Sequence, residues 1–146
     1  MKVWNYHTLH ELHPWPDYFV YVGRDQPAMG LKAHPFCNPF PPPNKSPEAL
    51  RACLETYRDH LWMMIQTDVT LFETLKNLHD KHLVCFCVPA PCHADIIKTF
   101  CQYLHAHQWS HADLQSFDTC PFPDVDSIAK KSQWVGWSLT QRPRIP

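Results

Sequence analysis

The sequence predicts a small α/β protein in which a single layer of parallel or mixed sheet is flanked by helices. Residues 18–22 and 83–87 are short apolar segments rich in β-branched and aromatic side chains, as is typical of strands. The segments between and after them carry apolar residues at helical spacing. Strands connected through a helical segment usually lie parallel in one sheet, and this favours the α/β class.

The first predicted strand, residues 18–22, ends at Gly23, and glycine is typical of the turn that follows a strand. Residues 24–44 then contain few regularly spaced apolar positions and a proline-rich run at 39–43. They predict a loop of about twenty residues, a length that in compact domains usually marks a functional or disordered segment. Within this loop, Asn38-Pro39-Phe40 is expected to form a turn anchored by the aromatic ring.

A helix is predicted to begin at Ser46-Pro47-Glu48, which supplies an N-cap, a proline at the first helical position and an acid in the first turn. Its apolar residues recur at i, i+3, i+4 and i+7 spacing. They are Leu50, Cys53, Leu54, Tyr57, Leu61, Met64 and Ile65. Cys53 is therefore expected in the core, and Arg58 lies beside this apolar stripe.

A second, shorter helix is predicted from about Asp68, with apolar residues at helical spacing up to Leu78. After the strand at 83–87, a third helix begins beyond Pro91, and Cys101 lies on its apolar face. From residue 105 onward the pattern weakens, although residues 134–139 have the composition of a third strand.

At 146 residues, with 45% hydrophobic and 13% aromatic residues, the chain is expected to form one domain. Its core should span about residues 18–105, followed by a C-terminal extension at 106–146. A formal net charge of -1 does not favour nucleic acid or an anionic membrane as a partner. No signal peptide and no run of roughly 20 apolar residues is present, so a cytoplasmic protein is expected. The oligomeric state is left open.

The seven cysteines are expected to be reduced thiols. Their number is odd, and Cys53 and Cys101 sit at helical core spacing rather than in a secreted disulfide framework. The eleven histidines are mostly scattered through polar or terminal segments and are expected at the surface.

The most informative segment is 83–95, where three cysteines, a histidine and an aspartate fall within thirteen residues at a strand-to-helix turn. Residues two apart on a strand share a face, so Cys85 and Cys87 should project together. Ligands of parallel sheets bind beyond the carboxyl ends of the strands. Arg24 follows the other strand, so it should lie at the same edge, and Asn38 from the long loop could cover it.

Four motifs in this chain resemble those of an uncharacterised bacterial and phage family, domain of unknown function 4326. They are Tyr21-x-Gly23-Arg24, Asn38-Pro39-Phe40, Tyr57-Arg58 and Cys85-x-Cys87-x-Pro89-x-x-Cys92-His93. The resemblance runs from about Phe19 to Leu104 and implies a family without a mechanism, but it favours placing Arg58 near the site. The chain departs from the pattern at Cys37, where glycine is expected, and at Phe86, where tryptophan is expected. Cys37 is therefore not expected to be a ligand that the family shares.

One interpretation of these residues is a site that binds, or also transforms, a phosphorylated or nucleotide-like small molecule. An arginine fork and backbone N–H groups at a helix start can hold an anion, and a thiolate near a helix N-terminus can act as a nucleophile. The predicted ligand-binding residues are Arg24, Asn38 and Arg58, and the predicted catalytic residues are Cys87, Cys92, His93 and Asp95. The sequence does not decide whether the protein is an enzyme.

A second interpretation is a structural or interaction module held by zinc or an iron–sulfur cluster, both of which favour thiolates. Its ligands would be Cys85, Cys87, Cys92 and His93. The adjacent Cys92 and His93 would have difficulty reaching one ion, so His34, Cys37 or Cys120 could supply the fourth ligand. In a third interpretation the cysteines are small buried hydrophobes, and His93 and Asp95 cap the helix. All three stay open at this point.

Overall fold

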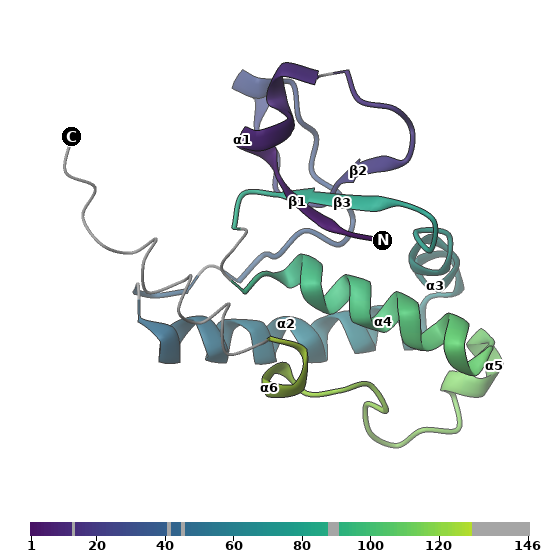
Figure 1. Ribbon diagram of the computed structural model, residues 1–146. Helices are drawn as coiled ribbons and strands as arrows, with labels where there is room; N and C mark the ends of the chain where they lie inside the picture. The colour runs from purple at the N-terminus through teal and green to yellow at the C-terminus, as the bar shows by residue number, and fades with distance from the viewer. Residues whose placement is uncertain (13, 41, 45, 88–90, 130–146) are drawn as a thin grey trace.

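The computed structural model describes residues 1–12, 14–40, 42–44, 46–87 and 91–129. These residues form a three-stranded parallel sheet that lies on a layer of helices, which confirms the predicted α/β class (Figure 1). The strands are β1 (Val3–Asn5), β2 (Phe19–Tyr21) and β3 (His82–Cys85). Their order in the sheet is β1-β3-β2, so β3 is the central strand.

The two faces of the sheet carry different side chains because successive residues of a strand point to opposite faces. Leu83 and Cys85 of β3 belong to the hydrophobic core beneath the sheet. On the opposite face, the rings of Trp4, Phe19 and His82 contact one another. The sheet is therefore covered by helices on one side and by aromatic side chains on the other.

Two helices of the layer are consecutive in the chain and precede β3. They are α2 (Pro47–Thr67) and α3 (Val69–Lys76). The α2 N-cap is as predicted, since the Ser46 hydroxyl accepts a hydrogen bond from the backbone N–H of Ala49 at 3.1 Å. Asp68 ends α2 and caps α3, accepting hydrogen bonds from the backbone N–H groups of Thr70 and Leu71. The predicted start of a second helix near Asp68 is thus confirmed.

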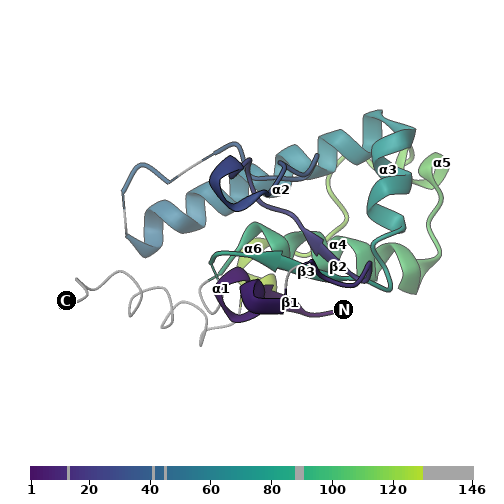
Figure 2. The same ribbon diagram turned by 90° about the horizontal axis from the view of Figure 1, so that it is seen from above.

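The long helix after β3 is α4 (His93–His107), and it begins at the turn that the sequence singled out. Seen from above, the strands lie over α4, with α2 beside them (Figure 2). Leu83, Phe100 and Tyr57 are completely buried where sheet, α4 and α2 meet. Cys53 and Cys101 lie in the buried interior as predicted, at 7% and 0% exposure.

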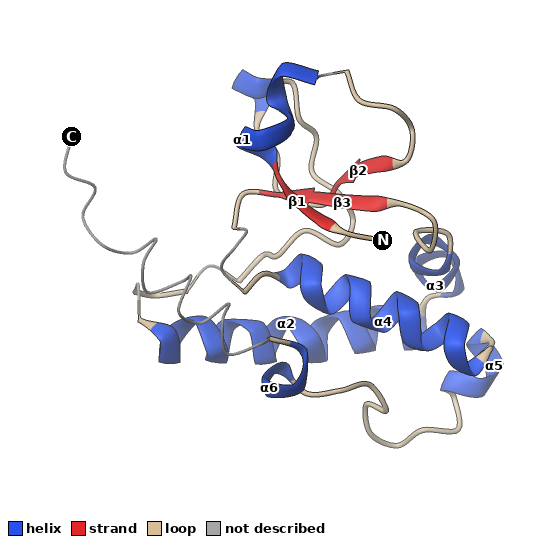
Figure 3. Cartoon of the chain, in the orientation of Figure 1, coloured by secondary structure: helices blue, strands red, loops and turns tan. Residues whose placement is uncertain are grey.

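Residues beyond α4 also enter the core. Two short helices lie in this part, α5 (His111–Leu114) and α6 (Val125–Ile128) (Figure 3). Phe122 stacks on Phe100 with ring centroids 4.0 Å apart, and Leu114 and Val125 are buried. The predicted strand at 134–139 lies outside the described residues.

The N-terminal strand β1 and the short helix α1 (Tyr6–Leu9) were not predicted. Two 3-10 turns, His10–Leu12 and Pro27–Met29, were also not predicted, and the second lies in the segment that was expected to be a loop. Among the helices of the described residues, none is both long enough and apolar enough to cross a membrane.

Candidate functional site

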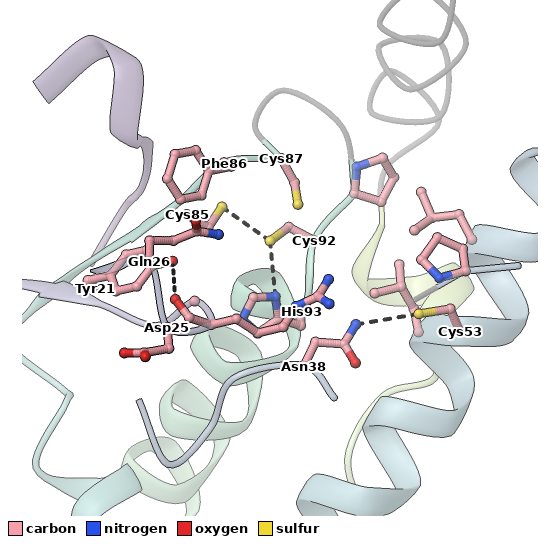
Figure 4. A pocket seen from close by; sticks show the side chains of 16 residues that line it. Tyr21, Asp25, Gln26, Asn38, Cys53, Cys85, Phe86, Cys87, Cys92 and His93 are labelled. Atoms are coloured by element: carbon pink, nitrogen blue, oxygen red, sulfur yellow. Dashed lines mark hydrogen bonds between the residues drawn. The ribbon is translucent and has the colours of Figure 1, made fainter. Parts of the chain in front are cut away.

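A pocket with a volume of about 530 Å³ lies where β2 and β3 end and α4 begins (Figure 4). Its walls also include the long loop and the first turns of α2. Cys85 lines the pocket, and so do five other predicted site residues: Arg24, Asn38, Cys87, Cys92 and His93. The predicted meeting of Arg24 with the Cys/His turn at one edge of the sheet therefore agrees with the structure.

The three cysteines of the turn converge in this pocket. The Sγ atoms of Cys85, Cys87 and Cys92 all lie within 4.8 Å of one another. The sulfur atoms of Cys92 and Cys85 lie 3.1 Å apart, within hydrogen-bond distance. Cys85 and Cys92 are almost completely buried, whereas Cys87 is exposed. The group is close enough to hold one metal ion, and it reaches solvent through Cys87.

The negative charge of this group is favoured at Cys87. Hydrogen bonds from the thiols of Cys85 and Cys92 hold the pKa of Cys87 well below its usual value, and the positive charge of Arg24 acts in the same direction. Hydrogen bonding to Cys87 raises the pKa of Cys85 to about 12, and hydrogen bonding to Cys85 and Cys87 raises the pKa of Cys92 well above its usual value. One thiolate is thus stabilised by two neighbouring thiols.

His93 forms the floor of the pocket beneath Cys92. Its Nε2 atom lies 2.7 Å from the carbonyl oxygen of Val22, and its Nδ1 atom lies 3.4 Å from the Cys92 sulfur. A carbonyl oxygen only accepts, so Nε2 carries the proton and Nδ1 of the neutral ring has a free lone pair. Burial lowers the pKa of His93, which favours this neutral ring. The His93 and Tyr57 rings make an edge-to-face contact, with ring centroids 5.3 Å apart.

Arg24 and Asn38 approach the cysteines from the long loop. Arg24 is exposed, and its guanidinium makes no ion pair or hydrogen bond with any other described residue. The side-chain oxygen Oδ1 of Asn38 accepts a hydrogen bond from the backbone N–H of Phe40 at 2.9 Å, and the side-chain Nδ2 donates to the Cys53 sulfur at 3.4 Å. Asn38 therefore organises the predicted turn and also lines the pocket.

Gly23 permits the side chain of Tyr21 to lie against the backbone at positions 23 and 24. The Tyr21 hydroxyl donates to the Arg24 carbonyl at 2.7 Å, and a Cβ atom on Gly23 would collide with the Tyr21 ring and hydroxyl. Any larger residue at position 23 would thus displace a wall of the pocket.

Two predicted site residues do not line the pocket. Arg58 donates from Nε to the Pro123 carbonyl at 2.7 Å and from a terminal nitrogen to the Phe122 carbonyl at 2.5 Å, so it holds the segment before α6 against α2. Asp95 accepts a hydrogen bond from the backbone N–H of Cys92 at 3.0 Å and completes a capping box. Its position corresponds to the capping interpretation.

The proposed fourth metal ligands also do not join the three sulfurs. Among the described residues, the ligand atoms that lie mutually within 4.8 Å belong to Cys85, Cys87 and Cys92 alone. His34, Cys37, Cys120 and the His93 ring in its present orientation are outside this group.

Several residues of the pocket were not predicted. Tyr21 and Phe86 contribute aromatic walls, and their rings lie 6.0 Å apart. Asp25 and Gln26 extend the polar side next to Arg24. Both aromatic residues lie near the carboxyl ends of predicted strands, where ligands of parallel sheets bind, so the sequence could have indicated that they line the site. The Val22 carbonyl is a backbone atom and has no signature in the sequence.

Comparison with curated proteins and with solved structures found no similar chain. A family model does match, over residues 7–103, which is about two thirds of the chain. The matched part contains β2, β3, α2, α3, most of α4 and the pocket, whereas β1 lies before it. The chain therefore belongs to the family described as a domain of unknown function, DUF4326.

Proposed function

We propose that the protein binds a small anionic molecule, phosphorylated or nucleotide-like in its chemistry, in the pocket at the ends of β2 and β3. The main support is Arg24. Arg24 lines the pocket, and its guanidinium has no ion pair or hydrogen bond with another described residue. A guanidinium fork is well matched to phosphate and carboxylate groups.

The size and place of the pocket support this proposal. A volume of about 530 Å³ is within the range of small-molecule sites. The pocket lies beyond the carboxyl ends of parallel strands, where ligands of α/β proteins usually bind.

The walls divide into a polar and an aromatic side, which suits a ligand with both characters. Tyr21 and Phe86 offer aromatic surface to a planar group such as a nucleobase. Asp25 lies beside Arg24 in the sequence and would repel an anion, so its carboxylate is suited to hydroxyl or amino groups of the ligand.

Transformation of the ligand has less support than binding. Asp95, one of the predicted catalytic residues, is engaged in the helix cap. The free Nδ1 lone pair of His93 faces Cys92, which is buried, rather than solvent. Our proposal is therefore limited to binding.

Isothermal titration calorimetry with inorganic phosphate, pyrophosphate and a series of nucleoside monophosphates and diphosphates tests the proposal. We expect at least one of these anions to bind, and Arg24→Gln to weaken its binding about tenfold or more, as loss of a charge-assisted hydrogen bond predicts. Lys32→Gln is the matched control, because Lys32 is an exposed cation of the same loop outside the pocket lining. Equal affinity in the wild type and Arg24→Gln, or no binding of any of these anions, would refute the proposal.

A further inference from the structure

We propose that Cys85, Cys87 and Cys92 together bind one zinc ion whose fourth coordination position faces the pocket. The three sulfur atoms already lie within 4.8 Å of one another. Around a tetrahedral zinc ion with Zn–S bonds of about 2.3 Å, sulfurs are separated by roughly 3.8 Å. Only small side-chain adjustments therefore separate the present arrangement from three-thiolate coordination.

The spacing of the sulfurs favours a single ion over an iron–sulfur cluster. In a [4Fe–4S] cluster each thiolate binds a different iron, and in a [2Fe–2S] cluster four ligands are divided between two irons, so the ligand sulfurs must spread around the whole cluster. Here Cys85 and Cys92 are only 3.1 Å apart, closer than even one zinc ion would hold them. Thiolate ligands select zinc or Cu(I) among single ions, and zinc suits a tetrahedral site with one open position.

Regular structure positions two of the three ligands. Cys85 is the last residue of β3, and Cys92 is the N-cap of α4. The backbone N–H of Ala94 points at the Cys92 sulfur at 3.4 Å, which is a favourable contact for a metal-bound thiolate. Cys87 lies two residues beyond β3 and is exposed, so it can close on an ion held by the other two.

An open coordination position also explains the spacing in the sequence. Structural zinc sites are usually completed by four protein ligands from two separated motifs, whereas here all three ligands fall within residues 85–92. Among the described residues no fourth ligand atom joins the group. Catalytic zinc sites use three protein ligands and leave the fourth place to water or substrate. All three cysteines line the pocket, so that place is accessible from it.

The His93 ring is an alternative fourth ligand that can be tested. The Nδ1 atom of His93 faces Cys92 at 3.4 Å, and the bond from Nε2 to the Val22 carbonyl fixes the ring. Because this nitrogen is not within 4.8 Å of all three sulfurs, we assign it to support of Cys92 and not to the ion. Metal binding at the cysteines does not depend on the anionic ligand proposed above.

Metal content and cobalt spectra of the full chain test the site. Protein purified anaerobically is stripped with a chelator and titrated with Zn²⁺ or Co²⁺. We expect one ion per chain and a strong thiolate-to-cobalt charge-transfer absorption. Cys87→Ser should lower the affinity at least tenfold while circular dichroism shows a folded protein, because Cys87 is exposed. Cys37→Ser and Cys120→Ser are controls outside the group and should bind as the wild type does.

Four results would overturn the metal site itself. They are a chain that takes up no ion, a cobalt spectrum without thiolate charge transfer, unchanged affinity in Cys87→Ser, and purified protein that contains several irons with acid-labile sulfide. Added azide should shift the cobalt spectrum by entering the open position. A spectrum that azide leaves unchanged but His93→Gln alters would place His93 on the ion and refute the open position. Arg24→Gln should keep the metal, so failure of the anion proposal and failure of the metal site are distinguishable.

Discussion

The Nε2 atom of His93 lies 2.7 Å from the carbonyl oxygen of Val22, although the two residues are 71 positions apart in the chain. Val22 follows β2, and His93 is the first residue of α4. This hydrogen bond therefore connects the two segments that carry Arg24 and the cysteines. It also sets the ring so that Nδ1 faces Cys92.

Loss of this bond should destabilise the metal-free protein. His93 is 7% exposed, so replacing its ring with an apolar one leaves the Val22 carbonyl without its partner. We expect His93→Phe to lower the free energy of unfolding by about 1–3 kcal/mol. Urea denaturation of the wild type and the variant measures this free energy. His107→Phe, at an exposed position of the same helix, should change it by less than about 0.5 kcal/mol. Equal effects in the two variants would show that the bond contributes nothing specific.

Thiol labelling should begin at one cysteine. Cys87 is exposed, whereas Cys85 and Cys92 are 1% and 2% exposed, so iodoacetamide should modify Cys87 first in the reduced, metal-free chain. Peptide mapping by mass spectrometry identifies the site, and Cys87→Ser should lack the fast phase. Added zinc should slow the labelling of Cys87. First modification at Cys37 or Cys120, which are half-buried, would contradict this expectation.

Arg58 should matter for stability and not for anion binding. Its guanidinium donates to the carbonyls of Pro123 and Phe122, and it does not line the pocket. Arg58→Gln should lower the free energy of unfolding by about 1–3 kcal/mol and leave anion affinity unchanged. Arg51 is the matched control on α2, because its ion pair with Asp126 at 3.0 Å is exposed and Arg51→Gln should cost less than about 1 kcal/mol. A loss of anion affinity in Arg58→Gln with unchanged stability would show that Arg58 contributes to anion binding, as the sequence predicted.

The sequence predicted those elements whose signals are local. The side chains of Ser46 and Asp68 accept hydrogen bonds from nearby backbone N–H groups, and Pro47 occupies the first helical position, so the starts of α2 and α3 can be predicted from a few residues. The turn from β3 into α4 was found for the same reason, since an apolar run, two prolines and a helical stripe follow one another.

Elements held by distant partners were not predictable in this way. Strand β1 has only three residues, too few for a recognisable strand pattern, and it is held in the sheet by pairing with β3, Val3 opposite Leu83. Arg58 donates to backbone carbonyls some 64 positions away, and backbone acceptors leave no side-chain motif in the sequence from which this contact could be predicted. For Asp95 the sequence offered both a capping and a catalytic role, and only the position of its carboxylate relative to the Cys92 N–H shows the cap.

Gly23 should be intolerant of a side chain because of one neighbour. A Cβ atom there would collide with the Tyr21 ring, so Gly23→Ala must displace a wall of the pocket. We expect a loss of about 1–3 kcal/mol in the free energy of unfolding, as for overpacking. In a Tyr21→Ala background the same substitution should cost distinctly less, and the double-mutant cycle measures the difference. A cost that is equal in both backgrounds would place its origin in the backbone and not in Tyr21.

Acid should weaken the fold partly through His34. Burial lowers the pKa of His34 from 6.5 to about 4, and its Nδ1 accepts a hydrogen bond from the backbone N–H of Phe36. The unfolded chain binds this proton more readily, so the stabilisation is complete above pH 6.5 and is lost as the pH falls toward 4. The two pKa values correspond to at most about 3 kcal/mol, and solvent around the half-buried ring reduces this.

Urea denaturation of chelated protein between pH 7 and pH 4.5 measures this dependence. His34→Gln should be less stable than the wild type at pH 7 but should lose less of its stability on acidification, because it no longer carries this titrating ring. Part of the slope should persist, since the pKa of His93 is also lowered by burial and its positive charge would face that of His34. Parallel stability curves for the two proteins would assign the acid sensitivity to His93 and to other groups.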